Sequence, residues 1–337
     1  KKFTQRLING TDASVPSVQA ELLTEAQKHS FTMRTNTVAV FAAMQKLGEN
    51  SQFLKELLGI WIDDHVLSRT HVTERDSLQA KAQNDWTAVL NGLEWADATL
   101  DENGQYQEFY DTQFVAQNQR QHLNSNMFSA QSSQIHRAMA ALTGFSTTID
   151  LSQDEQGTVK DEALLNLFYQ AVGEGLEGLD DYLKADILSK AEAGLHQFFT
   201  VDKVYGDYYV PALKAFLETT ESKSAIEAMR ALIETGTIDT TQQKAIAAFV
   251  DKGKMGAQSL QSLIALAELD IAQDSKEQIF TTTIGFGSDG VNHGVSAANV
   301  LTGVISKDMR QQTGIFPIAE KGQVQISNMQ EVYKRKI

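Results

Sequence analysis

The sequence predicts a mainly α-helical protein with a small β element, an α+β fold. Helical periodicity runs through most of the 337 residues, and only three prolines are present to interrupt it. One segment departs from this pattern, because the β-branched run IFTTTIGF at residues 279–286 is typical of a strand. With 42% hydrophobic residues, the chain can bury the core of one large domain or of two smaller ones.

Helix start and stop signals divide the first hundred residues. Pro16 suits the first turn of a helix. A second helix is expected from Thr35 or Asn36, either of which could cap it, to Gly48, which would end it. Over residues 75–100, five apolar side chains fall roughly on one helical face: Leu78, Ala82, Val89, Leu93 and Ala96.

A polar segment precedes the later helices. It holds thirteen Gln, Asn or Ser residues between Gln113 and Gln134, and its simplest interpretation is a surface loop. Helices are then predicted at residues 135–142, 162–173, 180–199, 210–219, 222–235, 240–251, 257–272, 294–301 and 326–336. The helix at 257–272, AQSLQSLIALAELDIA, is apolar enough to belong to the core.

Charge is distributed unevenly along the chain. The net charge of −14 argues against a generally basic nucleic-acid binder. Residues 150–192 carry eleven acids against three lysines, whereas residues 112–149 carry no acid and two arginines, Arg120 and Arg137. A site for a polyanion could therefore lie in an acid-free patch of an otherwise acidic protein.

Composition excludes several classes of site. The chain has no cysteine, which rules out disulfides, thiolate zinc sites and cysteine nucleophiles. No apolar run approaches 18 residues, so no membrane span is expected. The chain begins at Lys1 without methionine and ends in a basic stretch, so we expect it to be a piece of a longer polypeptide.

Asp289 is the one acid between Glu277 and Asp308, and glycines surround it just after the predicted strand. A carboxylate at the end of a buried strand can hold Mg²⁺, and a following glycine lets its backbone carbonyl approach the same ion. Such a geometry suits two-metal phosphoryl transfer. The simpler alternative is an ordinary Asp-Gly turn.

Other motifs are weaker. The run GFGSDG has the G-x-G-x-x-G spacing of a dinucleotide-binding loop, but no second parallel strand with an acidic tip follows it. An EF-hand starting at Asp289 fails because its twelfth position is Val300. His65 and His71, in DDHVLSRTH, are six residues apart and so lie off a common helical face, which favours surface polar residues over metal ligands.

The run DGVNHGVSAANVLTG resembles motif A of the single-subunit, phage-type RNA polymerases. That motif is an Asp-Gly step, a second glycine and a helix with Ser-Ala, matched here by Asp289, Gly290, Gly294, Ser296 and Ala297. The apolar helix at 257–272 lies where the family has a palm helix. Residues 114–142 resemble the family's upstream motif, an arginine-bearing loop before a helix, which makes Arg120 that arginine. The chain is most similar to the virion-packaged RNA polymerases of N-four-like phages.

This resemblance implies a partial right-hand polymerase fold, with thumb-like N-terminal helices and part of the palm. Asp289 and the Gly290 carbonyl would bind Mg²⁺, two ions being shared with a second aspartate. Arg120 and Gln119 would contact nucleic acid, and His293 and Asn292 the incoming nucleotide. The implied domains are a helical thumb-like region (1–110), an arginine-bearing segment (111–150), an acidic helical insertion (151–252) and a palm segment that starts the fingers (253–337).

Two signatures of that family, the Lys-bearing helix of motif B and the His-Asp of motif C, are not found after Asp289. We therefore expect the rest of the polymerase in the same or a second polypeptide, and no activity from this chain alone. The implied partners are a DNA template, nucleoside triphosphates, nascent RNA and other virion proteins. The implied location is the phage virion and then the host cytoplasm. The alternatives are a non-catalytic virion structural or ejection protein, a dinucleotide-binding domain through GFGSDG, and a DNA polymerase with the same palm aspartate.

Overall fold

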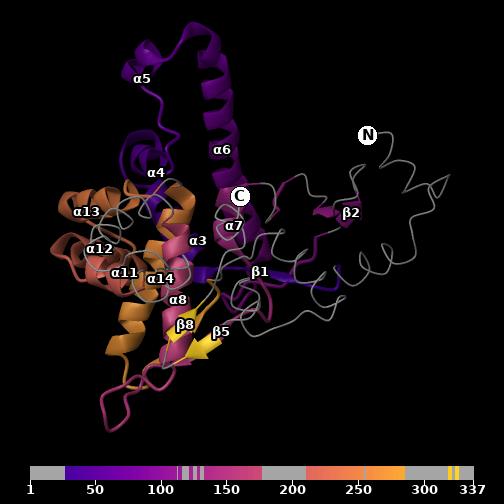
Figure 1. The fold of residues 1–337 in the computed structure, drawn as a ribbon. Coiled ribbons are helices and arrows are strands. Elements are labelled where there is room, and N and C mark those ends of the chain that lie inside the picture. The colour runs from indigo at the N-terminus through magenta and orange to yellow at the C-terminus, as the bar shows by residue number, and fades with distance from the viewer. Residues whose placement is uncertain are drawn as a thin grey trace, which may run out of the picture. The chain divides into compact units, whose positions relative to one another are not determined.

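The computed structural model confirms a mainly helical chain with short antiparallel strands (Figure 1). It describes residues 27–111, 127–129, 133–176, 210–253 and 256–284, together with strands at 113–115, 121–123, 318–320 and 323–325. Two compact units divide the chain. Unit 1 comprises residues 1–146, 231–237 and 256–261, and unit 2 comprises residues 147–230, 238–255 and 262–337. No helix among the described residues is long and apolar enough to cross a membrane.

Unit 1 is built around helix α3 (Thr35–Gln45), which packs on α4, α6 and α7. Its buried face includes Val40, Phe41 and Met44, all with no exposed surface. The other elements are β1 (Phe31–Met33), η1 (Glu49–Ser51), α4 (Gln52–Leu57), α5 (Asp64–Arg69), α6 (Val72–Thr99), β2 (Gln113–Val115), β3 (Gln121–Leu123), α7 (Gln134–Met139) and β4 (Ala140–Leu142).

Strand β1 is central to a small β arrangement in unit 1. On one side it pairs antiparallel with β4, in the register Phe31↔Leu142. On the other side Phe31 exchanges two backbone hydrogen bonds with Phe109, of 2.7 and 2.9 Å. Three chain segments thus lie side by side, although Phe31 is 78 residues from Phe109 and 111 residues from Leu142 in sequence.

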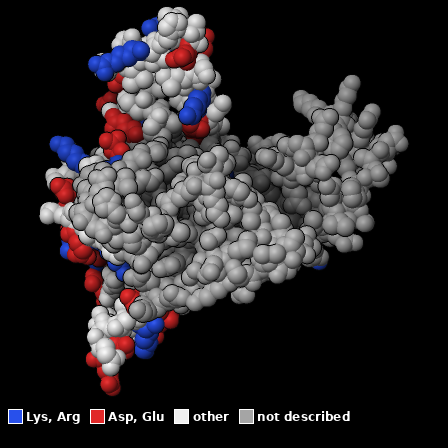
Figure 2. Space-filling view, viewed as in Figure 1, with Lys and Arg blue, Asp and Glu red and all other residues white. Residues whose placement is uncertain are grey.

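Helix α6 buries side chains only in its second half. The buried positions are Ala88, Val89, Gly92 and Ala96, whereas Val72 at its start is 69% exposed. In Figure 2, basic and acidic side chains mingle over the region where Figure 1 places α5 and the start of α6. This exposed stretch therefore carries both positive and negative charges.

Unit 2 combines a strand pair with a set of helices. Its elements are β5 (Thr147–Asp150), α8 (Glu162–Gly175), α11 (Val210–Leu217), most of α12 (Thr220–Thr235), α13 (Thr240–Val250), most of α14 (Gly256–Asp274), β6 (Ile279–Thr282), β7 (Ile318–Glu320) and β8 (Gln323–Gln325). Arg230 of α12 bridges Asp270 and Asp274 of α14, at 3.0 Å from the Asp270 carboxylate. Helix α13 starts with a capping box in which Asp239 and Gln242 exchange hydrogen bonds of 2.8 and 2.9 Å.

The helices predicted around 162–173, 210–219, 222–235, 240–251 and 257–272 are confirmed, and the last of these is core as expected. The Asp101–Gln105 turn is present as well, because the Asp101 carboxylate accepts from the backbone of Asn103 and Gln105. The helix predicted over residues 135–142 is wrong beyond Met139, where the chain continues as β4. Neither Thr35 nor Asn36 caps α3; Arg34 holds the N-cap position, without a side-chain cap. Strands β1 to β5 were not expected from the sequence.

Two glycines of unit 1 allow close packing, and replacing each of them with alanine should have a different effect on stability. A Cβ on Gly256 would lie 2.0 Å from the backbone oxygen of Leu57, whereas one on Gly92 would lie 2.5 Å from the flexible Met139 sulfur. We expect Gly256→Ala to lower the free energy of unfolding by about 1–3 kcal/mol, and Gly92→Ala to have the smaller effect because a thioether can move. All three tryptophans lie in unit 1, at positions 61, 86 and 95, so urea unfolding followed by tryptophan fluorescence reports on this unit. Equal losses in the two variants would contradict the packing argument.

Candidate functional site

The site residues predicted from motif A lie outside the described residues. These are Asp289, Gly290, Asn292 and His293. Gln119 and Arg120 also lie outside them, in the chain between β2 and β3, which pair antiparallel with Val115 opposite Gln121. What the structure defines is the strand from which the chain continues toward Asp289.

That strand, β6, is held in place by its partner and by an aromatic contact. It pairs antiparallel with β5 over its whole length, from Thr147↔Thr282 to Asp150↔Ile279. Its burial alternates as expected for a two-sided strand, with Phe280 2% exposed and Ile279 45% exposed. The Phe280 ring lies edge-on to Phe168 of α8 at 5.0 Å. Because a slip of one residue would turn Phe280 outward, this packing fixes the register of β6.

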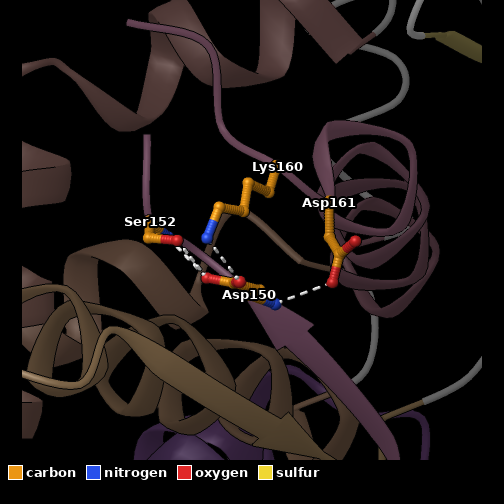
Figure 3. Close-up of polar contacts among 4 residues, drawn as sticks. All are labelled: Asp150, Ser152, Lys160 and Asp161. Carbon is orange, nitrogen blue, oxygen red and sulfur yellow. Dashed lines mark hydrogen bonds and ion pairs between the residues drawn. The ribbon is translucent and has the colours of Figure 1, made fainter. Parts of the chain in front are cut away.

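The loop that follows β5 contains a cluster of polar contacts centred on Asp150 (Figure 3). Oδ1 of Asp150 accepts hydrogen bonds from the backbone NH of Ser152 at 2.9 Å and from its hydroxyl at 2.5 Å. Oδ2 lies 3.3 Å from the ammonium of Lys160, and the backbone NH of Asp150 donates to Asp161 at 2.8 Å. The two hydrogen bonds from Ser152 lower the pKa of the Asp150 carboxyl; desolvation opposes them, and the interaction with Lys160 adds a smaller lowering effect.

This cluster has a structural role. Both Asp150 oxygens are used by its own loop, which also contains a second turn in which Asp154 accepts from the backbone of Gln156 and Thr158. Asp150 sits opposite Ile279, the first residue of β6, and the chain leaves β6 at the other end, after Thr282. Asp150 therefore lies at the end of the strand pair away from the chain's exit toward Asp289.

The interpretation of DDHVLSRTH as surface polar residues agrees with the structure. The Asp63 carboxylate caps α5 by accepting from the backbone NH of Val66 at 2.8 Å. His71 holds the N-cap position of α6, beside the hydroxyl of Thr73. Within the described ranges, no group of three or more His, Asp or Glu side chains is arranged to hold a metal ion.

A second set of unusual residues lies in unit 1, around a cluster of aromatic rings. Ring centroids in this cluster lie 5.6 to 6.2 Å apart and join Phe31, Trp95, Phe109 and Phe128. His136 of α7 packs on Phe128 at 4.5 Å and is 4% exposed. Its Nε2 donates to the carbonyl of Ala88 at 2.8 Å, while Nδ1 accepts from the NH of Ser129 at 3.3 Å. These bonds assign the neutral Nε2–H tautomer, and burial lowers the pKa of His136.

Arg34 is the residue in unit 1 that sequence reasoning missed. Its Nη1 donates to the carbonyls of Arg137, Ala138 and Ala140 at 2.5 to 3.0 Å, and its backbone NH donates to Met139 at 2.8 Å. These acceptors are the carbonyls that α7 leaves unsatisfied at its C-terminus. No sequence motif signals this contact, because the partners are backbone atoms more than 100 residues away.

Asp111 is buried but poorly satisfied. It is 8% exposed, and within the structure as described its Oδ2 has no hydrogen-bond partner. Burial raises the pKa of this carboxyl, because desolvation penalises its charged form.

Comparison with known proteins gives one match. Residues 18–140, just over a third of the chain, match the model of the virion DNA-directed RNA polymerase domain. Curated proteins and solved structures gave no match. The matched segment includes β1, α3 to α7 and the Gln119–Arg120 region, and it supports a relationship to phage virion RNA polymerases. It ends well before Asp289.

His136 predicts a specific pH dependence of stability. In the unfolded chain the His136 imidazole binds a proton near the ordinary pKa of 6.5, whereas burial lowers this pKa in the folded state. The contribution of the neutral imidazole to stability is therefore fully present above pH 6.5 and is lost as the pH falls below it. We expect the free energy of unfolding of unit 1 to fall by up to about 1.4 kcal/mol per pH unit below 6.5 from this one proton. Tryptophan fluorescence in urea at pH 5 to 8 measures it.

The matched variants are His136→Gln and His65→Gln. The first should be less stable at pH 7 but should depend less on pH between 5 and 7. His65 is exposed, so its variant should keep the wild-type slope. A slope unchanged in His136→Gln would show that the buried imidazole does not cause the effect.

Proposed function

We propose that this chain is part of a phage virion DNA-directed RNA polymerase in which Asp289 serves nucleotidyl transfer by a two-metal mechanism. The observation that carries the proposal is the domain match over residues 18–140. The resemblance of residues 289–303 to motif A supports it independently, because the matched segment contains none of those residues.

The strand leading to Asp289 suits such a role. Its packing gives β6 a fixed register, through Phe280 against Phe168 and through β5, so the chain leaves the strand from a defined position. A catalytic carboxylate must be positioned accurately, and sites supported by packed strands achieve this better than free loops do. The charge pattern is also favourable, because no other acid between Glu277 and Asp308 would repel a triphosphate.

In this proposal Asp289 and the Gly290 carbonyl supply oxygen ligands, which are the donors that Mg²⁺ prefers. Two bound Mg²⁺ ions would activate the 3′-hydroxyl and neutralise charge on the triphosphate and the leaving pyrophosphate. Arg120 and Gln119 would hold the phosphodiester backbone through charge and neutral donors. His293 and Asn292 would lie beside the incoming nucleotide. The second aspartate would come from another part of the polymerase.

The proposal also implies the partners and the place of action. DNA template, nucleoside triphosphates and nascent RNA would meet at Asp289, and other virion proteins would accompany the polymerase. The protein would be packaged in the phage virion and act in the host cytoplasm after delivery with the genome.

The first test uses the full-length protein in template-dependent incorporation of nucleoside triphosphates. Asp289→Asn should lower the rate by about a hundredfold or more, because lost metal binding removes several kcal/mol of transition-state stabilisation. Asp150→Asn is the matched control, since it removes the same charge at the far end of the strand pair and should retain activity. Undiminished synthesis by Asp289→Asn would refute the assignment.

The second test compares this 337-residue chain with the full-length protein under the same conditions. The chain alone should incorporate no nucleotide, because the second metal-binding aspartate is expected outside it. Adding the remaining segment as a separate polypeptide should restore synthesis if the two associate. Robust synthesis by the chain alone would place the active site elsewhere.

A further inference from the structure

Lys214 of α11 lies in an unusual environment for a lysine. Helices α8 and α11 pack on one another (Figure 1), and the Lys214 side chain is half-buried at their contact. Its Nζ donates to Oδ1 of Asn166 at 2.8 Å and lies 4.9 Å from the ring centroid of Tyr169, and both of these residues belong to α8. Asn166 is 5% exposed, so the acceptor is buried. Within the described part of the chain, no carboxylate forms an ion pair with Lys214.

This environment favours the neutral form of the Lys214 amine. Lys223, by comparison, is an exposed lysine whose ammonium lies 2.6 Å from the carboxylate of Glu218. The ammonium of Lys214 has only a neutral amide oxygen and an aromatic face as partners. Burial lowers the pKa of Lys214, and the negative charge of Glu162 opposes this effect. A neutral amine therefore forms more readily at Lys214 than at a solvated lysine.

The neutral amine can keep both of its contacts with α8. A neutral Nζ has two N–H bonds and one lone pair. One N–H can donate to Asn166, and the other can donate weakly to the face of the Tyr169 ring. Among the described residues no donor occupies the lone pair of Lys214. A desolvated lysine with a free lone pair is the form that acts as a nucleophile.

We propose that Lys214 is an acylation site, at which the amine held by Asn166 and Tyr169 reacts with small activated acyl donors such as acyl phosphates. The neutral Nζ attacks the carbonyl carbon of the donor, so that a C–N bond forms and the C–O bond to the phosphate breaks. The phosphate leaves with the electron pair of that bond, and Nζ loses one proton to water. The amide product is uncharged, so the attraction between the ammonium and the Tyr169 ring is lost.

Acylation would act on the strand that leads to Asp289. Tyr169 is the neighbour in α8 of Phe168, whose ring lies edge-on to Phe280 of β6 at 5.0 Å. Helices α8 and α11 and strand β6 all belong to unit 2. An acyl group at Lys214 adds volume to the contact between α8 and α11, and it therefore weakens the packing that gives β6 its register. This regulatory effect rests on the proposed function of Asp289, whereas the acylation itself is independent of that function.

The experiment treats the 337-residue chain with acetyl phosphate at pH 7 to 10 and follows acetylation of each lysine by peptide mass spectrometry. Lys244 is the matched control, because it is an exposed lysine in α13 of the same unit. Lys214 should react about threefold or more faster than Lys244 at pH 7, and this ratio should fall as the pH rises and both amines become neutral. Steric access alone would give a ratio that does not depend on pH.

Glu162→Gln tests the electrostatic part of the inference. Removing the Glu162 charge should lower the pKa of Lys214 further and so speed its acetylation at pH 7 by about twofold or more. The rate at Lys244 should stay as in the wild type. The acylation site is overturned if Lys214 reacts no faster than Lys244 at pH 7, if their ratio is constant with pH, or if Glu162→Gln leaves the rate at Lys214 unchanged.

Hydrogen exchange tests the effect on β6. Lys214→Gln, uncharged like the acylated lysine, should speed amide exchange in residues 279–282 by about tenfold, the factor expected for one lost hydrogen bond to a charged group. Lys214→Arg keeps the charge and should exchange as the wild type does. Equal exchange in the two variants would overturn the effect on β6.

The full-length protein separates this inference from the proposed function. Lys214→Gln should slow nucleotide incorporation, and Lys214→Arg should not. Active synthesis by the wild type, together with a reactivity ratio that is constant with pH, would overturn the acylation site alone. Selective acetylation of Lys214 in a full-length protein that incorporates no nucleotide would overturn the polymerase proposal alone.

Discussion

The arrangement of unit 1 depends on the contact between Arg34 and the end of helix α7. A helix of six residues forms few internal hydrogen bonds and leaves its last carbonyls unsatisfied. The Arg34 guanidinium and backbone NH together bind four of the carbonyls at that end. At the other side of α7, His136 joins the helix to α6 through Ala88. Between these two attachments the chain turns directly from α7 into β4, and β4 in turn positions one side of β1.

The helices could be predicted from the sequence because their signals are local. In α13 the capping box and the apolar spacing lie within a few residues, and both are visible in the letters alone. The β-branched run at 279–286 gave a local signal for β6, but the short strands β1 to β5 could not be predicted in the same way. β1 and β4 have three residues each, with no clear alternation, and their pairing joins positions more than 100 residues apart. The run HRAMAAL is helical by propensity, but β1 and Arg34 supply partners for its last residues, and the tertiary contacts decide their conformation.

The same distinction applies to the candidate sites: residues marked by their sequence neighbours can be predicted, and residues defined by distant contacts cannot. Asp289 could be singled out from the sequence because its isolation and its flanking glycines are local features. Arg34 could not, because a guanidinium that binds backbone carbonyls has no partner with a recognisable side chain.

For the proposed two-metal site, the contacts of Asp150 bear on where a second metal ligand would lie. Two-metal transfer needs carboxylates close enough to share ions about 4 Å apart. Asp150 is a strand residue near the predicted palm element, but its oxygens already accept from Ser152 and pair with Lys160. Moreover, β6 rises by about 10 Å from Ile279 to Thr282 at roughly 3.3 Å per residue, and it carries the chain away from Asp150 before Asp289 is reached. Recruiting Asp150 as that ligand would require breaking its contacts with Ser152 and Lys160. A second carboxylate supplied by another segment would avoid this cost, as the proposed function expects.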